Sequence, residues 1–316
     1  MAEKASEIPL NADVPAMEVS GLTVKFPVRG GVLGKVQRYF TAVDDVSFTL
    51  PQGKILSVVG ESGCGKSTLV KSLVGLVPMA SGTFKLFGET VCRGKVAGPA
   101  ALQKLEGLAT RKLDGLASQK LGRLASQKLG GLASQKPCRV SDLVQMIFQD
   151  PFSSLNPRQT VAEILTAPLL ARGVKFDVAE TRAKELLERV SLPAASLQKF
   201  PHEFSGGQRQ RLCIARSLMV RPRILLCDEV TSALDVSVQA QILHLLDDLR
   251  NEFGLSILFI SHDMQVVRAL SDEVLVMYFG HVVERGHADE VLTNPQHEYT
   301  QKLLASVPTI RRKICQ

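Results

Sequence analysis

One short segment, residues 60–68 (GESGCGKST), constrains the fold more than any other part of the chain. It fits the pattern G-x-x-x-x-G-K-[ST], with the apolar run ILSVV directly before it and LVKSLV behind it. Glycines let successive backbone N–H groups turn toward one anion without Cβ obstruction, and a helix N-terminus adds the positive end of its dipole. The spacing therefore predicts a buried strand, a phosphate-binding loop and a helix in that order, as in an α/β fold.

We call residues 60–68 the phosphate loop, and its predicted ligand is ATP with Mg²⁺. Lys66 supplies a positive charge at the β- and γ-phosphates, and Ser67 offers a hydroxyl to the metal. Because Cys64 lies near the helix N-terminus, we expect its thiolate form to be favoured. The predicted nucleotide contacts in the loop are Gly60, Glu61, Ser62, Gly63, Cys64, Gly65, Lys66, Ser67 and Thr68.

Composition narrows the class of protein. With 316 residues, 45% of them hydrophobic, the chain can bury one large core or two lobes. The N-terminus has no apolar h-region, and no run approaches the ~20 apolar residues of a membrane helix, so we expect neither a secretory signal nor a membrane span. The six cysteines form no C-x-x-C pair, which favours free thiols over a zinc or iron–sulfur site.

The net charge of +7 is unevenly distributed. Seven Lys and Arg residues fall within 101–136 beside only Glu106 and Asp114, and three more lie at 311–313. The rest of the chain is therefore close to neutral. A charge excess confined to an insert and a tail is typical of solvated segments, so we expect no nucleic-acid partner. Attraction of the tail to anionic lipid is the alternative.

The N-terminal part contains the aromatic candidates for the nucleotide base. Alternating apolar and polar residues predict strands over 17–26 and 41–50. An adenine ring needs a flat π-face to stack on, and Phe26, Tyr39 and Phe40 offer one. Ordinary packing is the alternative role for all three, and we take Phe26 as the predicted adenine contact.

Residues 104–135 are four tandem octads, KLEGLATR, KLDGLASQ, KLGRLASQ and KLGGLASQ. At about 100° per residue, an eight-residue period drifts by about 80° per repeat, so the leucines do not form one helical face. The repeated glycines weaken a helix further. We interpret about 99–137 as a mobile repeat insertion with no part in the chemistry.

The second half of the chain places polar residues at the ends of predicted strands and helices. Residues 144–149 form a strand pattern that ends in Gln149, and helical patterns cover about 159–171 and 177–190. Residues 204–208 (FSGGQ), called the signature segment below, open a further helix with Ser205 as its N-cap.

Two further apolar strands lead to acids and a histidine. Residues 224–227 (ILLC) precede Asp228 and Glu229, and residues 256–260 (SILFI) precede the segment that contains His262. In parallel α/β sheets, ligands bind at the carboxyl ends of the strands. In a chain with a phosphate loop, two acids at such an end indicate Mg²⁺ binding and activation of water. The strand end before His262 favours a position beside the γ-phosphate, and a structural or exposed histidine is the alternative.

Taken together, these motifs resemble the ATP-binding subunits of ABC transporters over residues 16–310. The phosphate loop is common to many nucleotide triphosphatases. The signature segment is specific to ABC ATPases when it occurs in order with Gln149, Asp228, Glu229, SALD at 232–235 and His262. The resemblance implies an α/β, P-loop nucleotide-binding domain with a RecA-like core, an antiparallel β subdomain and an α-helical subdomain.

The resemblance also implies the domain boundaries. We expect a flexible leader at 1–15, an ATPase domain at 16–286 and a C-terminal extension at 287–316. Within the ATPase domain, the helical subdomain covers about 150–219, and the repeat insertion interrupts the chain before it.

The resemblance further implies that two such domains stack head to tail, with each ATP held between one phosphate loop and the partner's signature segment. The expected contacts across that interface are Ser205, Gly206, Gly207 and Gln208, with Asp235 on a partner-facing loop. ATP thereby joins the two domains, and its hydrolysis weakens the interface.

Within one domain, the resemblance assigns the metal and catalytic residues. Asp228 and Gln149 join Ser67 at Mg²⁺. Glu229 acts as general base on the attacking water, while His262, Gln149 and Lys66 complete the catalytic set.

Finer features resemble the dipeptide and oligopeptide importer branch. They are QDP at 149–151, SLNPR at 154–158, SALDVSVQAQ at 232–241, and NPQHEYT at 294–300 with leucines at 303 and 304. Glu298 departs from the branch's H-P-Y-T pattern at the position of the proline. A single tail cysteine argues against the cysteine-ligated C-terminal cluster found in some relatives.

The function implied by the resemblance is ATP hydrolysis that powers peptide import. The implied partners are membrane permease subunits, a second ATPase subunit (a copy or a sister chain) and, indirectly, a solute-binding protein, at the cytoplasmic face of the bacterial inner membrane. One alternative is an importer for another solute such as nickel or glutathione. The other is a soluble ABC ATPase acting on DNA or ribosomes, a class that typically carries zinc cysteines or two modules per chain.

Overall fold

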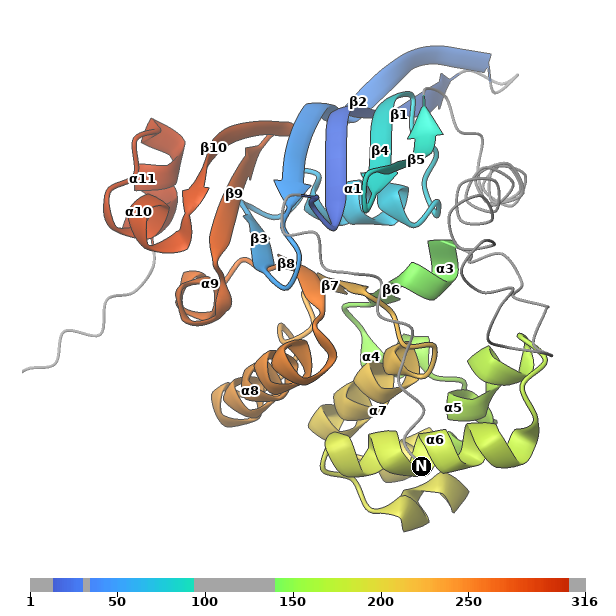
Figure 1. Cartoon of the computed structure of the whole chain (residues 1–316). Helices are drawn as coiled ribbons and strands as arrows, with labels where there is room; N and C mark the ends of the chain where they lie inside the picture. The colour runs from blue at the N-terminus through green and yellow to red at the C-terminus, as the bar shows by residue number, and fades with distance from the viewer. Residues whose placement is uncertain (1–13, 31–34, 94–139, 307–316) are drawn as a thin grey trace, which may run out of the picture.

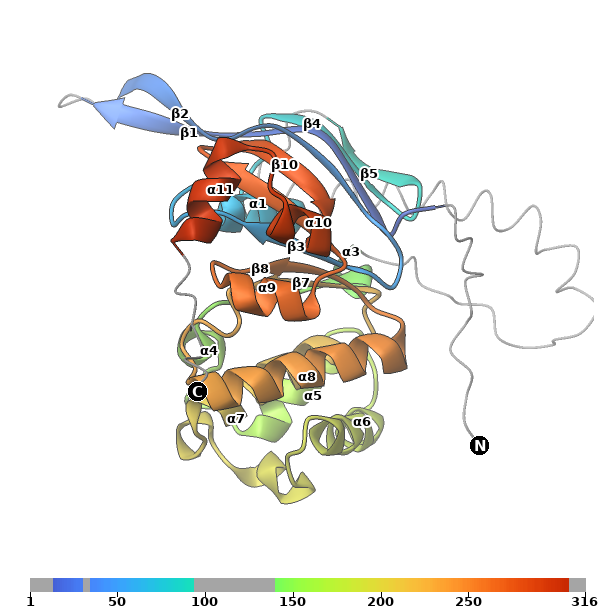
Figure 2. The same ribbon diagram turned by 90° about the vertical axis from the view of Figure 1, so that its left-hand side faces the viewer.

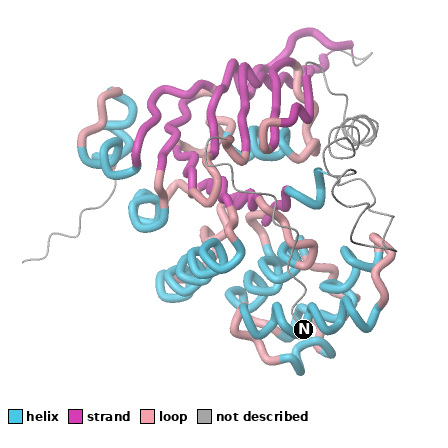
Figure 3. The backbone as a smooth tube through the Cα atoms, in the orientation of Figure 1, coloured by secondary structure: helices cyan, strands magenta, loops and turns pink. Residues whose placement is uncertain are grey.

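The computed structural model describes residues 14–30, 35–93 and 140–306. The expectations for the repeat octads, most of the leader and the end of the tail lie outside these residues. Two sheets dominate the described part (Figure 3). The smaller sheet is antiparallel with strand order β2-β1-β4-β5. Its strands are β1 (Met17–Gly30), β2 (Lys35–Leu50), β4 (Ser81–Leu86) and β5 (Glu89–Arg93).

The larger sheet has the order β10-β9-β3-β8-β7-β6, in which only the β9–β10 pair is antiparallel. The parallel strands β3, β7 and β8 are buried along their whole length, as expected for a sheet covered on both faces. The strands are β3 (Ile55–Val59), β6 (Val144–Ile147), β7 (Ile224–Asp228), β8 (Ser256–Ile260), β9 (Glu273–Tyr278) and β10 (His281–His287).

The helices form layers around the larger sheet (Figures 1 and 2). Helix α1 lies between the two sheets, whereas α8 and α9 cover the opposite face of the larger sheet, above a separate lobe of helices. The helices of the core and C-terminal region are α1 (Lys66–Leu73), α3 (Val140–Leu143), α8 (Val236–Phe253), α9 (Met264–Leu270), α10 (Ala288–Thr293) and α11 (Glu298–Ala305). The lobe contains α4 (Pro151–Ser154), α5 (Val161–Leu170), α6 (Phe176–Arg189), α7 (Gly206–Leu218) and two short 3₁₀ turns.

Within the described ranges, apolar side chains form three clusters that correspond to these layers. One fills the space between the sheets and includes Leu69, Val70 and Leu73 of α1. A second joins the larger sheet to α8 and the helical lobe. The third packs α9, α10 and α11 against the end of β3 at Val59. Strand β3, which leads into the phosphate loop, is therefore fixed by core packing on both faces of the sheet.

The N-terminal strands are longer than the sequence pattern predicted. Strand β1 continues past residue 26, and strand β2 begins before residue 41. The two strands pair from Met17 and Leu50 out to Gly30 and Lys35. The outer part projects from the body as a hairpin (Figure 2). Residues 25–27 and 36–40 are exposed there, so the apolar alternation that marks a half-buried strand is absent.

In the described ranges, no helix combines the length and the apolar character that crossing a bilayer requires.

Candidate nucleotide site

The predicted site residues come from strand ends that meet at one edge of the larger sheet. Strand β3 leads into the phosphate loop, β6 into Gln149, β7 into Asp228 and Glu229, and β8 into His262. These four strands are parallel neighbours in the order β3-β8-β7-β6. The sheet therefore brings together residues that are up to 202 positions apart in the sequence.

Close backbone approaches explain two glycines of the phosphate loop. A Cβ on Gly60 would stand 2.2 Å from the carbonyl oxygen of Met277, and one on Gly65 would stand 2.3 Å from that of Ala42. Both residues also have positive φ angles, 149° and 109°. No larger side chain fits at either position. The loop is thus held between strands β2 and β9.

Lys66 turns back over its own loop. Its Nζ donates hydrogen bonds of 2.8 Å to the carbonyl oxygens of Gly60 and Glu61, and its side chain is buried. A buried ammonium group is costly unless it is hydrogen-bonded, and these carbonyls satisfy it. Because they are neutral, an anionic phosphate oxygen is a stronger partner for the same group.

The side chains of Ser67 and Asp228 are joined by a hydrogen bond. The Ser67 hydroxyl donates to Oδ1 of Asp228 at 2.7 Å. Burial raises the pKa of the Asp228 carboxyl, and the hydrogen bond from Ser67 opposes that shift. Hydroxyl and carboxylate oxygens are what Mg²⁺ prefers, so the two side chains suit this ion.

Glu229 has an unusual backbone. Its φ is 48°, a left-handed value for a residue with a Cβ. The N–H of Glu229 donates to the carbonyl of Ile260 at 3.2 Å, and its carbonyl accepts from the Ser232 hydroxyl at 2.9 Å. Such strain costs on the order of 1 kcal/mol or more and persists where the surroundings impose it, which is often at functional sites.

Two other predicted residues approach one oxygen atom of the Glu229 side chain. Gln149 Nε2 donates to Oε2 of Glu229 at 2.9 Å, and Nδ1 of His262 lies 3.6 Å from the same oxygen. A hollow of about 150 Å³, lined in part by Glu229, Ser232 and His262, opens beside them. The carboxylate is therefore oriented by two neighbours and has space next to it for a small molecule such as water.

The expectation that Cys64 favours its thiolate form is wrong. The side chain is 6% exposed, and burial raises the pKa of the thiol. The Lys66 ammonium, 3.8 Å from Sγ, opposes this shift without reversing it. Proximity to a helix N-terminus predicted the wrong direction because the sequence did not show that the Cys64 side chain is buried.

The signature segment lies apart from the phosphate loop, at the start of α7. Ser205 and Gln208 form a reciprocal capping box, in which Gln208 N donates to Ser205 Oγ at 3.3 Å and Ser205 N donates to Gln208 Oε1 at 3.0 Å. Both side chains are exposed. Among the described residues, no hydrogen bond joins 204–208 to the phosphate loop.

Packing against α8 accounts for one of the signature glycines. A Cβ on Gly207 would lie 2.4 Å from Cγ1 of Val238, whereas one on Gly206 would meet Leu234 at an ordinary 3.7 Å. Asp235 caps α8, with Oδ1 accepting from Val238 N at 2.9 Å. The predicted partner-facing residues thus occupy the neighbouring N-termini of α7 and α8.

The three aromatic candidates for the adenine contact lie together on the projecting hairpin. Phe26 is paired with Phe40 across β1 and β2, and Tyr39 is paired with Pro27. All three aromatic side chains are exposed. The choice of Phe26 stays a prediction, since its neighbours offer the same chemistry.

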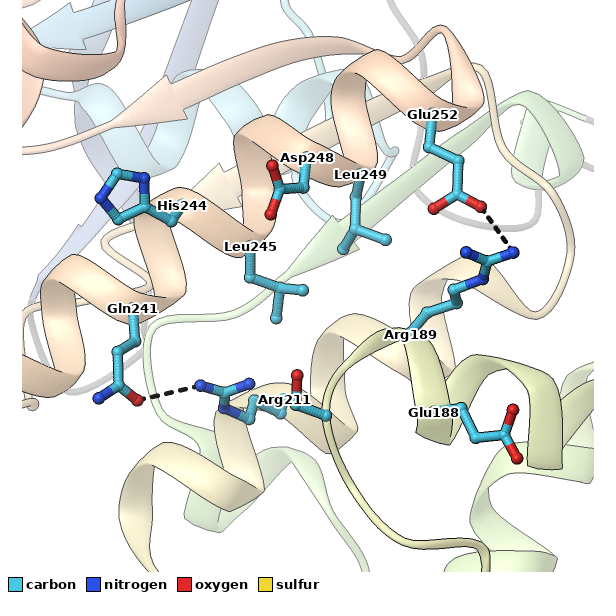
Figure 4. A pocket seen from close by; sticks show the side chains of 10 residues that line it. Glu188, Arg189, Arg211, Gln241, His244, Leu245, Asp248, Leu249 and Glu252 are labelled. Carbon is cyan, nitrogen blue, oxygen red and sulfur yellow. Dashed lines mark hydrogen bonds and ion pairs between the residues drawn. The ribbon is translucent and has the colours of Figure 1, made fainter.

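A larger hollow, of about 480 Å³, lies elsewhere, between α6, α7 and α8 (Figure 4). Arg189 pairs with Glu252 at 3.1 Å, and Arg211 donates to Gln241 at 3.1 Å, so polar contacts connect the helical lobe to α8 here. None of the predicted site residues lines it.

One contact to the phosphate loop was missed by the sequence analysis. The hydroxyl of Tyr299, in α11, accepts a hydrogen bond of 2.9 Å from the backbone N–H of Glu61. In the sequence, the segment HEYT at 297–300 indicates only a branch of importers. Its tyrosine gave no signal of contact, because the two residues are 238 positions apart and meet only in the folded chain.

A phosphate loop, an oxygen-ligand pair and an oriented carboxylate at one edge of a parallel sheet define a P-loop nucleotide triphosphatase, and the α7 signature narrows this to the ABC type. The chain belongs to the ABC transporter family, whose model matches residues 43–232. A second model, the C-terminal region of oligopeptide/dipeptide transporters, matches residues 283–315. The fold class and the family expected from the sequence are confirmed, and the ATP-binding domains of this family are ATPases.

Similar curated proteins carry the name glutathione import ATP-binding protein GsiA. The protein from Pectobacterium atrosepticum is 43% identical over 302 residues, which are 95% of this chain and 42% of the relative. The protein from Escherichia coli K12 is 43% identical over 295 residues, or 93% and 41%. The chain therefore spans about two fifths of the length of these relatives.

Solved structures share the fold. The structure of cbiO1 from Clostridium perfringens, described as part of the ABC transporter complex cbiONQ, superposes with a TM-score of 0.66 at 22% identity, covering 94% of this chain and 97% of that one. The ATP-binding cassette MJ0796, in a dimeric post-hydrolysis state with ADP and Pi, gives 0.64 at 22% identity, covering 86% and 98%.

Proposed function

We propose that the chain hydrolyses Mg-ATP to power import of short peptides through a membrane ABC transporter at the cytoplasmic face of the bacterial inner membrane. The observation that carries the peptide assignment is the match of residues 283–315 to the C-terminal region of oligopeptide/dipeptide transporters. The site at the sheet edge supports the ATPase part. Glutathione is a tripeptide, and the GsiA relatives favour it as the first solute to test.

The residues of the site fit ATP and Mg²⁺. Because only glycine fits at positions 60 and 65, no Cβ atom stands there to obstruct the backbone N–H groups of the phosphate loop. Ser67, Asp228 and Gln149 would hold the metal, which when bound neutralises charge on the phosphates. Lys66 would exchange the carbonyls of Gly60 and Glu61 for phosphate oxygens.

The remaining side chains act on the attacking water. Oε2 of Glu229 would accept its proton as general base, and Gln149 and His262 would hold that carboxylate and the water in line with the γ-phosphate. Closure with a second ATPase domain would bring the partner's copies of Ser205, Gly206, Gly207 and Gln208 to the opposite side of the nucleotide.

The first test is purification of the full chain from membranes with whatever it binds. Membrane subunits in the complex support an importer, whereas ribosomes or DNA would support the soluble alternative. In vesicles that contain the complex and its solute-binding protein, ATP-driven uptake of labelled glutathione or a dipeptide is expected. Uptake of nickel without any peptide would contradict the peptide assignment.

A further inference from the structure

The C-terminal region is bonded directly to the phosphate loop. Tyr299 is 7% exposed and packs in one cluster with Val59, the last residue of the strand that leads into the loop. Its hydroxyl accepts from the Glu61 N–H at 2.9 Å. Burial raises the pKa of this phenol, so it remains a neutral hydroxyl at physiological pH.

Tyr299 and Lys66 are hydrogen-bonded to the same peptide group of the loop. The N–H of Glu61 and the carbonyl of Gly60 belong to the same peptide plane, which Tyr299 holds at one end and the Lys66 ammonium at the other. When a phosphate draws Lys66 away, the bond to Tyr299 is the one that keeps this plane in orientation. The hydroxyl therefore matters most in the nucleotide-bound state.

The start of α11 is itself fixed to the core. The carboxylate of Glu284 in β10 accepts from the N–H groups of Gln296 and His297 at 2.8 and 3.1 Å. The Tyr299 ring lies 4.1 Å from that of Tyr278 at the end of β9. Tyr299 thus reaches the loop from a helix anchored on the strand pair β9–β10.

We propose that α11 is a positioning element of the phosphate loop, and that Tyr299 couples nucleotide binding to docking of the C-terminal region. The inference rests on the proposed function, because it requires ATP at the loop. Coupling is reciprocal: if docking of α11 strengthens nucleotide binding, nucleotide must strengthen docking of α11 by the same factor.

The test compares Tyr299→Phe with Tyr278→Phe, which removes a hydroxyl from the neighbouring ring. For Tyr299→Phe we expect the Kd for Mg-ATP to rise about fivefold, the effect of one net hydrogen bond. In the wild type, ATP should slow hydrogen exchange over 298–305, and this protection should be lost in Tyr299→Phe. Tyr278→Phe should match the wild type in both measurements.

The outcomes separate the two proposals. If the wild type binds no Mg-ATP, the proposed function fails, and this inference fails with it. If the wild type and Tyr299→Phe bind ATP equally and protect 298–305 equally, only the coupling is overturned. Should Tyr299→Phe not fold, Glu284→Gln loosens the same helix from β10, and the coupling predicts weaker ATP binding there too; unchanged binding would contradict it.

Discussion

Two helices of this molecule begin at glycine-rich segments, and their surroundings differ sharply. Helix α1 begins at the end of the phosphate loop, which packs closely against β9 at Gly60 and against β2 at Gly65 and is bonded through Ser67 to Asp228. Helix α7 begins at the signature segment, whose exposed Ser205 and Gln208 side chains bond to their own helix. The charged groups proposed for the chemistry lie near the start of α1. The start of α7 instead presents a helix N-terminus and the Ser205 hydroxyl to a second molecule.

This difference fits the proposal that a second domain completes the site. The first-turn N–H groups of a helix have no partner within the helix, and the capping box satisfies only part of them at α7. Glycines at 206 and 207 keep side chains away from that end. An anion presented by another ATPase domain would complete it, which agrees with the proposed head-to-tail arrangement.

The largest expected effect lies on the α1 side. Glu229→Gln keeps the size of the side chain and removes the base, so ATP turnover should fall by about 10²- to 10⁴-fold while the Kd for ATP stays near that of the wild type. Light scattering in the presence of ATP should then detect a long-lived dimer. Glu188→Gln, in the hollow of Figure 4, is the control. Turnover near wild type in Glu229→Gln would remove this residue from its proposed role.

A smaller effect tests the α7 side. Gly207→Ala forces a methyl group against Val238, and such overpacking should lower the free energy of unfolding by about 1–3 kcal/mol. Gly206→Ala places its methyl group at an ordinary distance and serves as the matched control. Urea denaturation measures both. A double mutant that also carries Val238→Ala should recover part of the loss, and an equal loss in the two alanine variants would refute the clash.

The smallest expected effect is on the alkylation rates of two buried cysteines, one in the phosphate loop and one in α7. Burial raises the pKa of both Cys64 in the phosphate loop and Cys213 in α7, so alkylation at neutral pH should be slower than that of a free cysteine and should accelerate as pH rises. Mg-ATP should slow labelling of Cys64 by several-fold and leave Cys213 unchanged. Peptide mass spectrometry resolves the two sites; equal protection would mean that nucleotide acts globally rather than at the loop.

Much of the nucleotide site could be predicted because its motifs are local. The strand before the loop, the cap at Ser205 and the acids after β7 each depend on a few consecutive residues, and each lies where the pattern predicted. Helix α8 (Val236–Phe253) also has local determinants, since the sequence itself supplies its apolar face, its N-cap Asp235 and the glycine that ends it at 254.

The predictions that failed or fell short depended on surroundings. Burial raises the pKa of Cys64, which lies in the apolar cluster between the two sheets with Val43 of β2 and Met277 of β9, and β9 is far from the loop in the sequence. The outer hairpin of β1 and β2 is held by strand pairing, and its residues 25–27 and 36–40 are exposed, so hydrophobic alternation could not indicate it.

The sequence by itself determined that this chain has a phosphate loop, two acids and a histidine at strand ends, and a signature helix. These follow from spacing and residue type within short windows. Only the tertiary structure decided that β8 lies between β3 and β7, that Gln149 and His262 converge on one oxygen of Glu229, and that Tyr299 holds the Glu61 peptide. The reason is physical: strand order and long-range contacts arise from the burial of the whole sheet between two layers, and no local pattern encodes them.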